Sequence, residues 1–243
     1  MEHDLLEGHN PNCAYIVACA DCDCSKEEDI DMTDIKVIET TRIAGSRHLT
    51  LWEKKVSRNG NEFPYFMACR GEQPPAPHAE KKPDAVVIVA FWDHGGERRL
   101  IITSEYRIPI GTREMGFPAG LIDDKDYENS DGYEDAARSA AIRELKEETG
   151  FDFTPIEVSP NNLYSSPGMT NESVVFVFGI ATASKNAPAP EELEDIEVTS
   201  VSHGELQGLL NLSEDERDFA FGKTSFPFMW SFCYAGFPQH IKV

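Results

Sequence analysis

The chain has 243 residues, of which 40% are hydrophobic, and its formal net charge is −21 at pH 7. This length is enough for a buried core and fits one domain with a substantial appendage, or two small domains. The strong negative charge argues against nucleic acid or a membrane surface as the main partner, because both attract basic faces. A small anionic substrate stays compatible if metal ions supply local positive charge.

The first 35 residues are expected to form a cysteine-rich and then acidic arm with little order. The chain starts Met1-Glu2-His3-Asp4, which is acidic where a secretory signal would be basic. No stretch approaches the roughly 18–20 apolar residues of a membrane span, so the chain reads as cytoplasmic. Its crowded cysteines favour free thiols over a structural zinc site, which usually shows two cleanly spaced pairs. They are Cys13, Cys19, Cys22 and Cys24.

A small antiparallel β domain is predicted over residues 36–72. Its strands are three β-prone runs, at residues 36–41, 47–56 and 63–70. Between the last two, the Asn-Gly pair within residues 58–61 is a strong hairpin signal. A proline-rich linker at residues 73–77 then leads to a second domain, which we place at residues 83–243.

The second domain alternates apolar strands with helices. Strands are predicted at residues 84–92, 99–106, 115–122, 173–181 and 195–201. Residues 123–133 read as a polar loop, and Tyr133–Thr149 as a helix with Gly150 as its C-terminal cap. A second helical region is expected at 205–210 and 214–221, and the aromatic residues of 226–237 should pack in the core or cover an interface. This order predicts an α/β sandwich with a mixed sheet, preceded by the small antiparallel domain.

Three carboxylates on the predicted helix form a candidate site for a metal ion. Glu144, Glu147 and Glu148 project from one helix face, where like charges repel. A bound divalent cation would offset the repulsion, because hard cations take oxygen ligands. The alternative is an ordinary solvated face, rich in Glu because Glu is a good helix former.

The segment at residues 143–151 resembles the second half of the Nudix box, R-E-U-x-E-E-x-G-U with U apolar, at every constrained position. Residues 105–109, 117–124 and 165–172 resemble motifs of the ADP-sugar pyrophosphatase branch of that superfamily, of which this chain looks like a divergent member. The resemblance covers roughly residues 36–210. It implies a Nudix-type α/β/α sandwich and Mg²⁺, or Mn²⁺, as cofactor. The implied reaction splits the pyrophosphate of ADP-ribose or a related nucleoside diphosphate sugar into AMP and a sugar phosphate.

The resemblance also assigns metal ligands. Glu144 and Glu148 would bind the cation, and the carbonyl of Ala119 would complete the site. Glu147 would be a further ligand or a catalytic acid. Arg143 would form salt bridges that orient a glutamate of the box.

The catalytic base is expected in the acidic loop before the last strand. In the branch that this chain resembles, a glutamate of a later flexible loop acts as the base or binds another metal. Glu194 is the favoured residue here, with Glu191 and Glu192 as alternates, because mobile loops commonly carry the catalytic group. The plain alternative is a solvated acidic loop.

Substrate contacts are implied for four residues. Arg107 is a candidate for the phosphates, since a guanidinium fork matches phosphate oxygens. Arg70 fits the position of another family arginine, and Leu121 follows the Ala119-Gly120 pair at the strand end. Tyr65 would stack on adenine, or else be a core or interface tyrosine. The resemblance further implies a homodimer.

The front half of the box departs from the family pattern. Gly120 lies 23 positions before Arg143, so about nine residues are inserted. Two shorter acids can replace the family's first glutamate: Asp126 has the right distance from Gly120, and Asp135 has the right distance from Arg143. Two other functions stay open, a Nudix hydrolase of a dinucleotide such as NADH or a diadenosine polyphosphate, and a non-catalytic module that senses a nucleotide.

Overall fold

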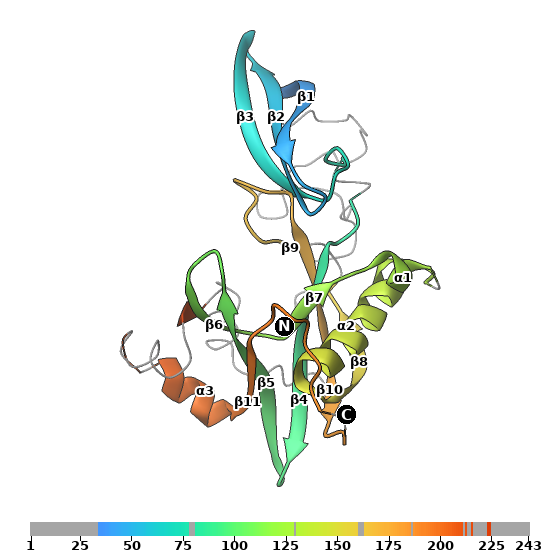
Figure 1. Cartoon of the computed structure of the whole chain (residues 1–243), viewed down its shortest axis with the longest axis vertical. Coiled ribbons are helices and arrows are strands. Elements are labelled where there is room, and N and C mark those ends of the chain that lie inside the picture. Colours follow the sequence, from blue (N-terminus) through green and yellow to red (C-terminus); the bar gives the residue numbers. More distant parts are fainter. Residues whose placement is uncertain are drawn as a thin grey trace, which may run out of the picture. The chain divides into compact units, whose positions relative to one another are not determined.

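The computed structural model describes residues 34–77, 81–128, 130–159, 163–185 and 187–210, with residues 212, 215, 223 and 224. Figure 1 shows its elements in chain order. The four clustered cysteines, the aromatic residues of 226–237 and all of 214–221 except residue 215 lie outside this description. Within it, no helix is long and apolar enough to cross a membrane.

The described chain divides into two compact units. The first comprises residues 34–40 and Lys54–Tyr65, and the second comprises Thr41–Glu53 and everything described from Phe66 onward. A three-stranded sheet in the order β1-β2-β3 contributes residues to both units. Its strands are β1 Lys36–Gly45, β2 Leu49–Arg58 and β3 Asn61–Arg70. The domain division expected from the sequence stays a prediction.

The predicted hairpin turn between β2 and β3 is present. Asn59 has φ 51° and Gly60 has φ 78°, so both residues adopt the left-handed conformation. Asn and Gly tolerate this conformation best, and two such residues in sequence match the twist of paired strands. The Asn-Gly pair therefore sets the register of this hairpin.

The second unit is built on a mixed sheet of nine described strands. Two pairs, β10 with β4 and β12 with β6, are parallel, and the other pairs are antiparallel. The strands are β4 Ala85–His94, β5 Glu97–Arg107, β6 Thr112–Gly116, β7 Ala119–Leu121, β8 Asp152–Val158, β9 Leu163–Tyr164, β10 Ser173–Thr182, β11 Ile196–Ser202 and β12 Lys223–Thr224.

Strands β4 and β5 pair only near their hairpin. Phe91–His94 pairs with residues 97–100, and the rest of the two strands takes different partners. On β5, residues 103–107 pair with β6. On β4, residues 85–87 pair with β7, which follows β6 directly in the chain. The β6–β7 segment therefore lies between the diverging ends of the two central strands.

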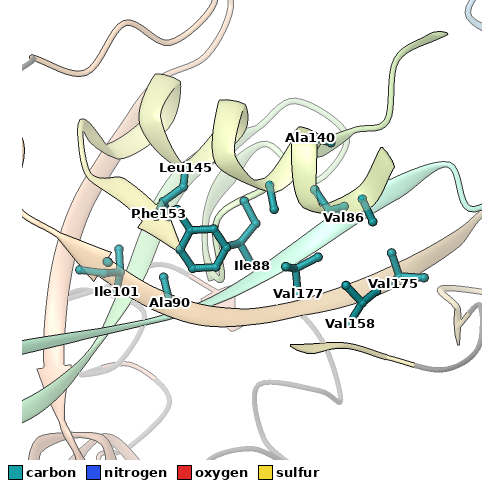
Figure 2. Packing of buried hydrophobic residues seen from close by; sticks show 13 residues of the cluster. Val86, Ile88, Ala90, Ile101, Ala140, Leu145, Phe153, Val158, Val175 and Val177 are labelled. Atoms are coloured by element: carbon teal, nitrogen blue, oxygen red, sulfur yellow. The ribbon is translucent and has the colours of Figure 1, made fainter. Parts of the chain in front are cut away.

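Helix α2, Tyr133–Thr149, covers one face of the sheet and has the bounds predicted from the sequence. Its buried alanines and Leu145 pack on alternate residues of the central strands, as Figure 2 shows for the labelled side chains of β4, β8 and β10. The helix ends at Gly150, whose φ of 74° is left-handed and favours glycine. A second cluster lies on the other sheet face with helix α3, His203–Leu210, and includes Leu206 and Leu209. The α/β/α sandwich with a mixed sheet is thus confirmed.

Several elements differ from the sequence prediction. The polar loop predicted at 123–133 contains a short helix, α1 Asp124–Tyr127. This helix begins with a capping box in which Asp123 and Asp126 satisfy each other's backbone amides, an arrangement that polar loop residues can also form. The predicted strand at 115–122 is two strands, because Phe117 and Pro118 interrupt it. Strands β8, β9 and β12 were not predicted, since β8 contains Pro155 and the other two have two residues each.

Leu145→Ala should lower the free energy of unfolding by about 2–5 kcal/mol, because the Leu145 side chain is fully buried between α2 and the sheet. Ile142→Ala on the same helix is the matched control, since Ile142 is 43% exposed. Urea denaturation followed by circular dichroism measures both. Equal effects of the two substitutions would contradict the packing of α2 described above.

Candidate active site

Glu148 is the most deeply buried carboxylate on α2, with 5% of its surface exposed. The backbone amide of Ala119, at the start of β7, donates a hydrogen bond to this side chain. The other side of the carboxylate is unsatisfied, because Oε2 has no hydrogen-bond partner among the described residues. An unpartnered buried carboxylate oxygen is costly, so the position calls for a cation or a proton.

The surroundings of Glu148 favour its protonated form in the absence of a cation. Burial raises the pKa of Glu148 to about 9, and the negative charges of Glu144, Glu194 and Glu105 add to this effect. The hydrogen bond from Ala119 opposes the rise and is the smaller influence. A pKa this far from the ordinary range is typical of functional sites, although ion-pair networks also produce such shifts.

Glu144 lies directly over Gly120 of β7. A Cβ atom placed on Gly120 would collide with the carboxyl carbon and both oxygens of Glu144. The absence of a side chain at this point is therefore what lets the helix carboxylate reach the strand. Burial raises the pKa of Glu144, and it outweighs the lowering by the adjacent Arg143.

Arg143 connects α2 to the segment before it. Its Nη1 atom lies 2.6 Å from Oε1 of Glu144 and 3.4 Å from Oε2 of Glu147, and its Nη2 atom donates to the carbonyl of Leu121 at 3.0 Å. Burial acts to lower the pKa of Arg143, but its carboxylate partners outweigh burial and raise it. The guanidinium thus holds Glu144 in place, which is the role that the resemblance implied.

Asp126 is the acid that meets Arg143 from the inserted segment. Its Oδ2 atom accepts hydrogen bonds from Nη2 of Arg143 and from the amide of Asp123, both at 2.9 Å. Asp126 is 7% exposed, whereas Asp135 is exposed in the first turn of α2. Of the two acids that the sequence left open, Asp126 therefore takes the position beside the arginine. Its shorter side chain reaches because α1 brings its backbone close.

The acidic loop before β11 brings one of its three glutamates to the helix. Glu191 and Glu192 are exposed, while Glu194 is half-buried. Its charge contributes to the raised pKa values of Glu105, Glu144 and Glu148, so it lies close to all three. The turn is closed by the amide of Glu194, which donates to the carbonyl of Glu191 at 3.0 Å.

Glu105 is a member of this cluster that the sequence reasoning missed. It lies on β5 opposite Glu114 of β6, and Arg107 bridges the two, at 2.8 Å from Glu105 and 2.7 Å from Glu114. Burial raises the pKa of Glu105 although Arg107 opposes it, and Glu194 and Glu114 add to the rise. A signal was present, because Glu105 is the first residue of the segment 105–109 that resembles a family motif.

The substrate-contact candidates lie in different surroundings. Arg107 is engaged by the two carboxylates just described, and Arg70 pairs with Glu172, whose other oxygen accepts from Ser165 at 2.9 Å. Leu121 is exposed beside the box and offers its carbonyl to Arg143. Tyr65 is exposed and belongs to the first unit, whereas the other three candidates belong to the second.

The donor set suits a hard divalent cation. Glu144 and Glu148 are oxygen donors one turn apart, the second with an unsatisfied oxygen, and Glu147 beside them is about half exposed. In the part of the chain that the structure describes, no three His, Cys, Asp or Glu side chains already converge as a ready-made metal site. Arg143 occupies part of the coordination space by holding Glu144.

The comparisons with known proteins identify the class. The model of the NUDIX domain family matches residues 81–221, more than half of the chain, and includes β4, β7, α2 and the loop of Glu194. The chain therefore belongs to the Nudix family and carries a Nudix hydrolase domain.

Known proteins with similar sequences and a solved structure with a similar fold agree with this assignment. An uncharacterized Nudix hydrolase of Schizosaccharomyces pombe is 33% identical over 119 residues, 48% of this chain and 53% of that protein. An ADP-sugar pyrophosphatase of Mus musculus is 30% identical over 135 residues, 51% of this chain and 57% of that protein. The chain thus spans about half the length of the curated relatives it matches. The crystal structure of an ADP compounds hydrolase shares the fold, with a TM-score of 0.51 at 19% identity, covering 82% of this chain and 92% of that one.

The raised pKa of Glu148 predicts a pH-dependent stability when divalent cations are removed with EDTA. The unfolded chain loses this proton near pH 4.5, whereas the folded chain keeps it to about pH 9. Between these values the unfolded state binds fewer protons, so the free energy of unfolding falls as pH rises. Glu148→Gln should remove this fall, on the order of 2–4 kcal/mol between pH 5 and 8.5.

Urea denaturation at several pH values, with EDTA present, measures the slope. Glu134→Gln removes an exposed carboxylate from the first turn of the same helix and serves as the control. Parallel slopes for wild type and Glu148→Gln would show that Glu148 is not buried in its neutral form.

Proposed function

We propose that this chain is a Mg²⁺-dependent hydrolase of the pyrophosphate bond in ADP-ribose or a related nucleoside diphosphate sugar, and that it releases AMP and a sugar phosphate. The observation that carries the proposal is the unsatisfied, buried carboxylate of Glu148 beside Glu144 and near Glu194. A purely structural helix face does not bury acids against one another, because that arrangement lowers stability. The relative named ADP-sugar pyrophosphatase supports the substrate class.

Glu144 and Glu148 would hold the metal, with the carbonyl of Ala119 and Glu194 as further oxygen donors and Glu147 at the rim. Mn²⁺ has the same ligand preference. A bound divalent cation supplies charge neutralisation at the phosphates and acidifies a water molecule. Arg143 keeps Glu144 aimed at the site, and Gly120 leaves the room that its carboxylate occupies.

Glu194 is the residue that we propose as the general base. Water adds to one phosphorus, its proton passes to the carboxylate of Glu194, and the bond from that phosphorus to the bridging oxygen breaks. The bridging oxygen leaves with the other phosphate and so produces two monoesters. Glu191 and Glu192 are poorer candidates, because both are exposed in the turn that precedes Glu194.

Arginines would recognise the substrate's phosphates. Arg107 lies on β5 next to the acidic cluster, and a dianionic pyrophosphate can compete with Glu105 and Glu114 for its guanidinium. Arg70 is fixed by Glu172 in a similar way. Tyr65 would stack on adenine, and Leu121 would contact the substrate beside the box.

Two other functions stay in view. A dinucleotide such as NADH or a diadenosine polyphosphate presents the same pyrophosphate to the same carboxylates. A nucleotide-sensing module without catalysis is disfavoured, because a sensor does not need mutually repelling buried acids. The location in the cytoplasm stays a prediction.

Glu148→Gln should reduce ADP-ribose hydrolysis at least about 100-fold in the presence of Mg²⁺, as expected when a ligand of a catalytic metal is lost. Release of AMP, followed by chromatography, measures the rate across a panel of ADP-ribose, NADH and a diadenosine polyphosphate. Glu134→Gln is the control and should retain the wild-type rate, because its carboxylate lies in the exposed first turn of α2.

Three results of this panel are decisive. Full activity of Glu148→Gln would remove the metal assignment. A wild-type preference for a dinucleotide would change the substrate class but keep the chemistry. If wild type hydrolysed nothing in the panel, the sensor would become the better explanation.

We also propose a homodimer. The first unit exposes large apolar side chains on its strands, with Val37, Ile38 and Phe63 each more than half exposed. Contiguous exposed apolar patches commonly mark an interaction surface. The family resemblance implies that the occupant is a second copy of the chain.

Sedimentation velocity should therefore give a mass near twice the 27.1 kDa of one chain. Ile38→Asp places a charge on the apolar surface and should shift the protein toward the monomer, whereas Glu39→Gln on the same strand should not. A wild-type protein that sediments as a monomer at micromolar concentration would contradict the proposal.

A further inference from the structure

We propose that Arg113 is the positioning residue for Glu194, holding the acidic loop so that its last carboxylate faces α2. This inference rests on the function proposed above and adds a residue that neither the box nor its resembled motifs contain. Arg113 lies on β6, outside the cluster of carboxylates, and acts through contacts to the residue that follows Glu194.

Arg113 makes four polar contacts, three at the start of β11 and one to β5. Its Nη1 atom donates to the carbonyls of Ser104 at 2.8 Å and Asp195 at 3.3 Å. Its Nη2 atom lies 2.9 Å from Oδ1 of Asp195 and 3.1 Å from Oε1 of Glu197. Because a guanidinium is planar and offers several donors in fixed directions, these contacts define both the backbone and the side chain of Asp195.

The contact crosses a strand. Residues 103–105 of β5 pair with β6 and also with β11, so these two strands lie on opposite edges of β5. Arg113 of β6 pairs with Tyr106 of β5, and its side chain reaches over β5 to Asp195. The amide of Tyr106 donates to the carbonyl of Asp195 at 3.2 Å and adds a second attachment at the same point. The end of the loop is thus tied to two strands of the sheet.

The other end of the loop is tied to the helix. The amide of Ala189 donates to the carbonyl of Glu147 on α2 at 2.8 Å. Between the two attachments, the turn is closed by bonds of its own, including one at 2.8 Å from the amide of Glu191 to Oε2 of Glu194. The position of Glu194 toward α2 then depends on where Asp195 is held, and Arg113 supplies most of the side-chain contacts that hold it.

The chain contains a matched arginine that contacts the other end of β11. Arg99 of β5 contacts β11 near its C-terminal end, with Nη2 donating to the carbonyl of Ser200 at 2.7 Å and to Glu205 at 2.7 Å. Like Arg113, Arg99 binds one backbone carbonyl of this region and two acidic side chains, the second being Glu97. The two arginines differ in that only Arg113 adjoins the loop of Glu194.

The experiment compares Arg113→Gln with Arg99→Gln in the full chain. Amide hydrogen exchange followed by mass spectrometry reports on a peptide that covers residues 187–195, and steady-state kinetics with ADP-ribose and Mg²⁺ report on catalysis. We expect Arg113→Gln to speed exchange in this peptide and to lower kcat about 10–100-fold, the effect usual for residues that orient a catalytic group. Arg99→Gln should leave both readings near wild type.

A double variant tests whether Arg113 acts through Glu194. In the Glu194→Gln background, adding Arg113→Gln should lower kcat no further, because residues that act as a unit are not additive. Urea midpoints of the two single arginine variants show whether a loss of folding explains the result.

Each outcome decides the inference. Wild-type exchange in the peptide of Arg113→Gln, or equal kcat values for the two arginine variants, would overturn it. Additive losses in the double variant would also overturn it. If wild type hydrolyses no substrate, the proposed function fails, and the exchange measurement alone then decides whether Arg113 holds the loop.

Discussion

The burial of one carboxylate against the edge of a strand is the constraint on which the rest of the site depends. Glu148 is taken out of water by the packing of α2 on the sheet, and the negative charges of Glu144, Glu194 and Glu105 lie close enough to raise its pKa. Packing energy from the apolar face of α2 is what makes this unfavourable arrangement possible. The fold therefore holds like charges together at the place where we propose that a cation binds.

Two arginines pair with some of these carboxylates and leave Glu148 without a cationic partner among the described residues. Arg143 neutralises Glu144 and Asp126 on one side, and Arg107 neutralises Glu105 and Glu114 on the other. The charges of Glu144 and Glu105 both act on Glu148, which keeps an unsatisfied oxygen among the described residues. This incomplete pairing leaves negative charge for the cation that we propose, because an arginine at every acid would already balance it.

Regular periodicity explains what the sequence could predict. The bounds of α2 follow from its small-residue face and from Gly150, and the clustering of Glu144 and Glu148 follows from helical spacing together with the family motif. Asp126 could not be chosen over Asp135, because the choice depends on α1, whose capping box looks like a polar loop in the sequence. Glu105 and Arg113 were missed for a different reason, since their partners come together only through the register of β5 with β6 and β11.

The short helix α1 sets the position of Asp126, so the geometry of the site does not depend on the full length of the inserted segment. Asp126 is fixed by its own capping box, and Ser130 also donates to its carbonyl, so its contact with Arg143 depends on the chain up to Ser130 and not on the path from Asp131 to Tyr133. Insertions of different length in that stretch would leave the acid where it is. The segment therefore offers a natural place to graft a peptide or a probe within a few residues of the site, without moving the carboxylates.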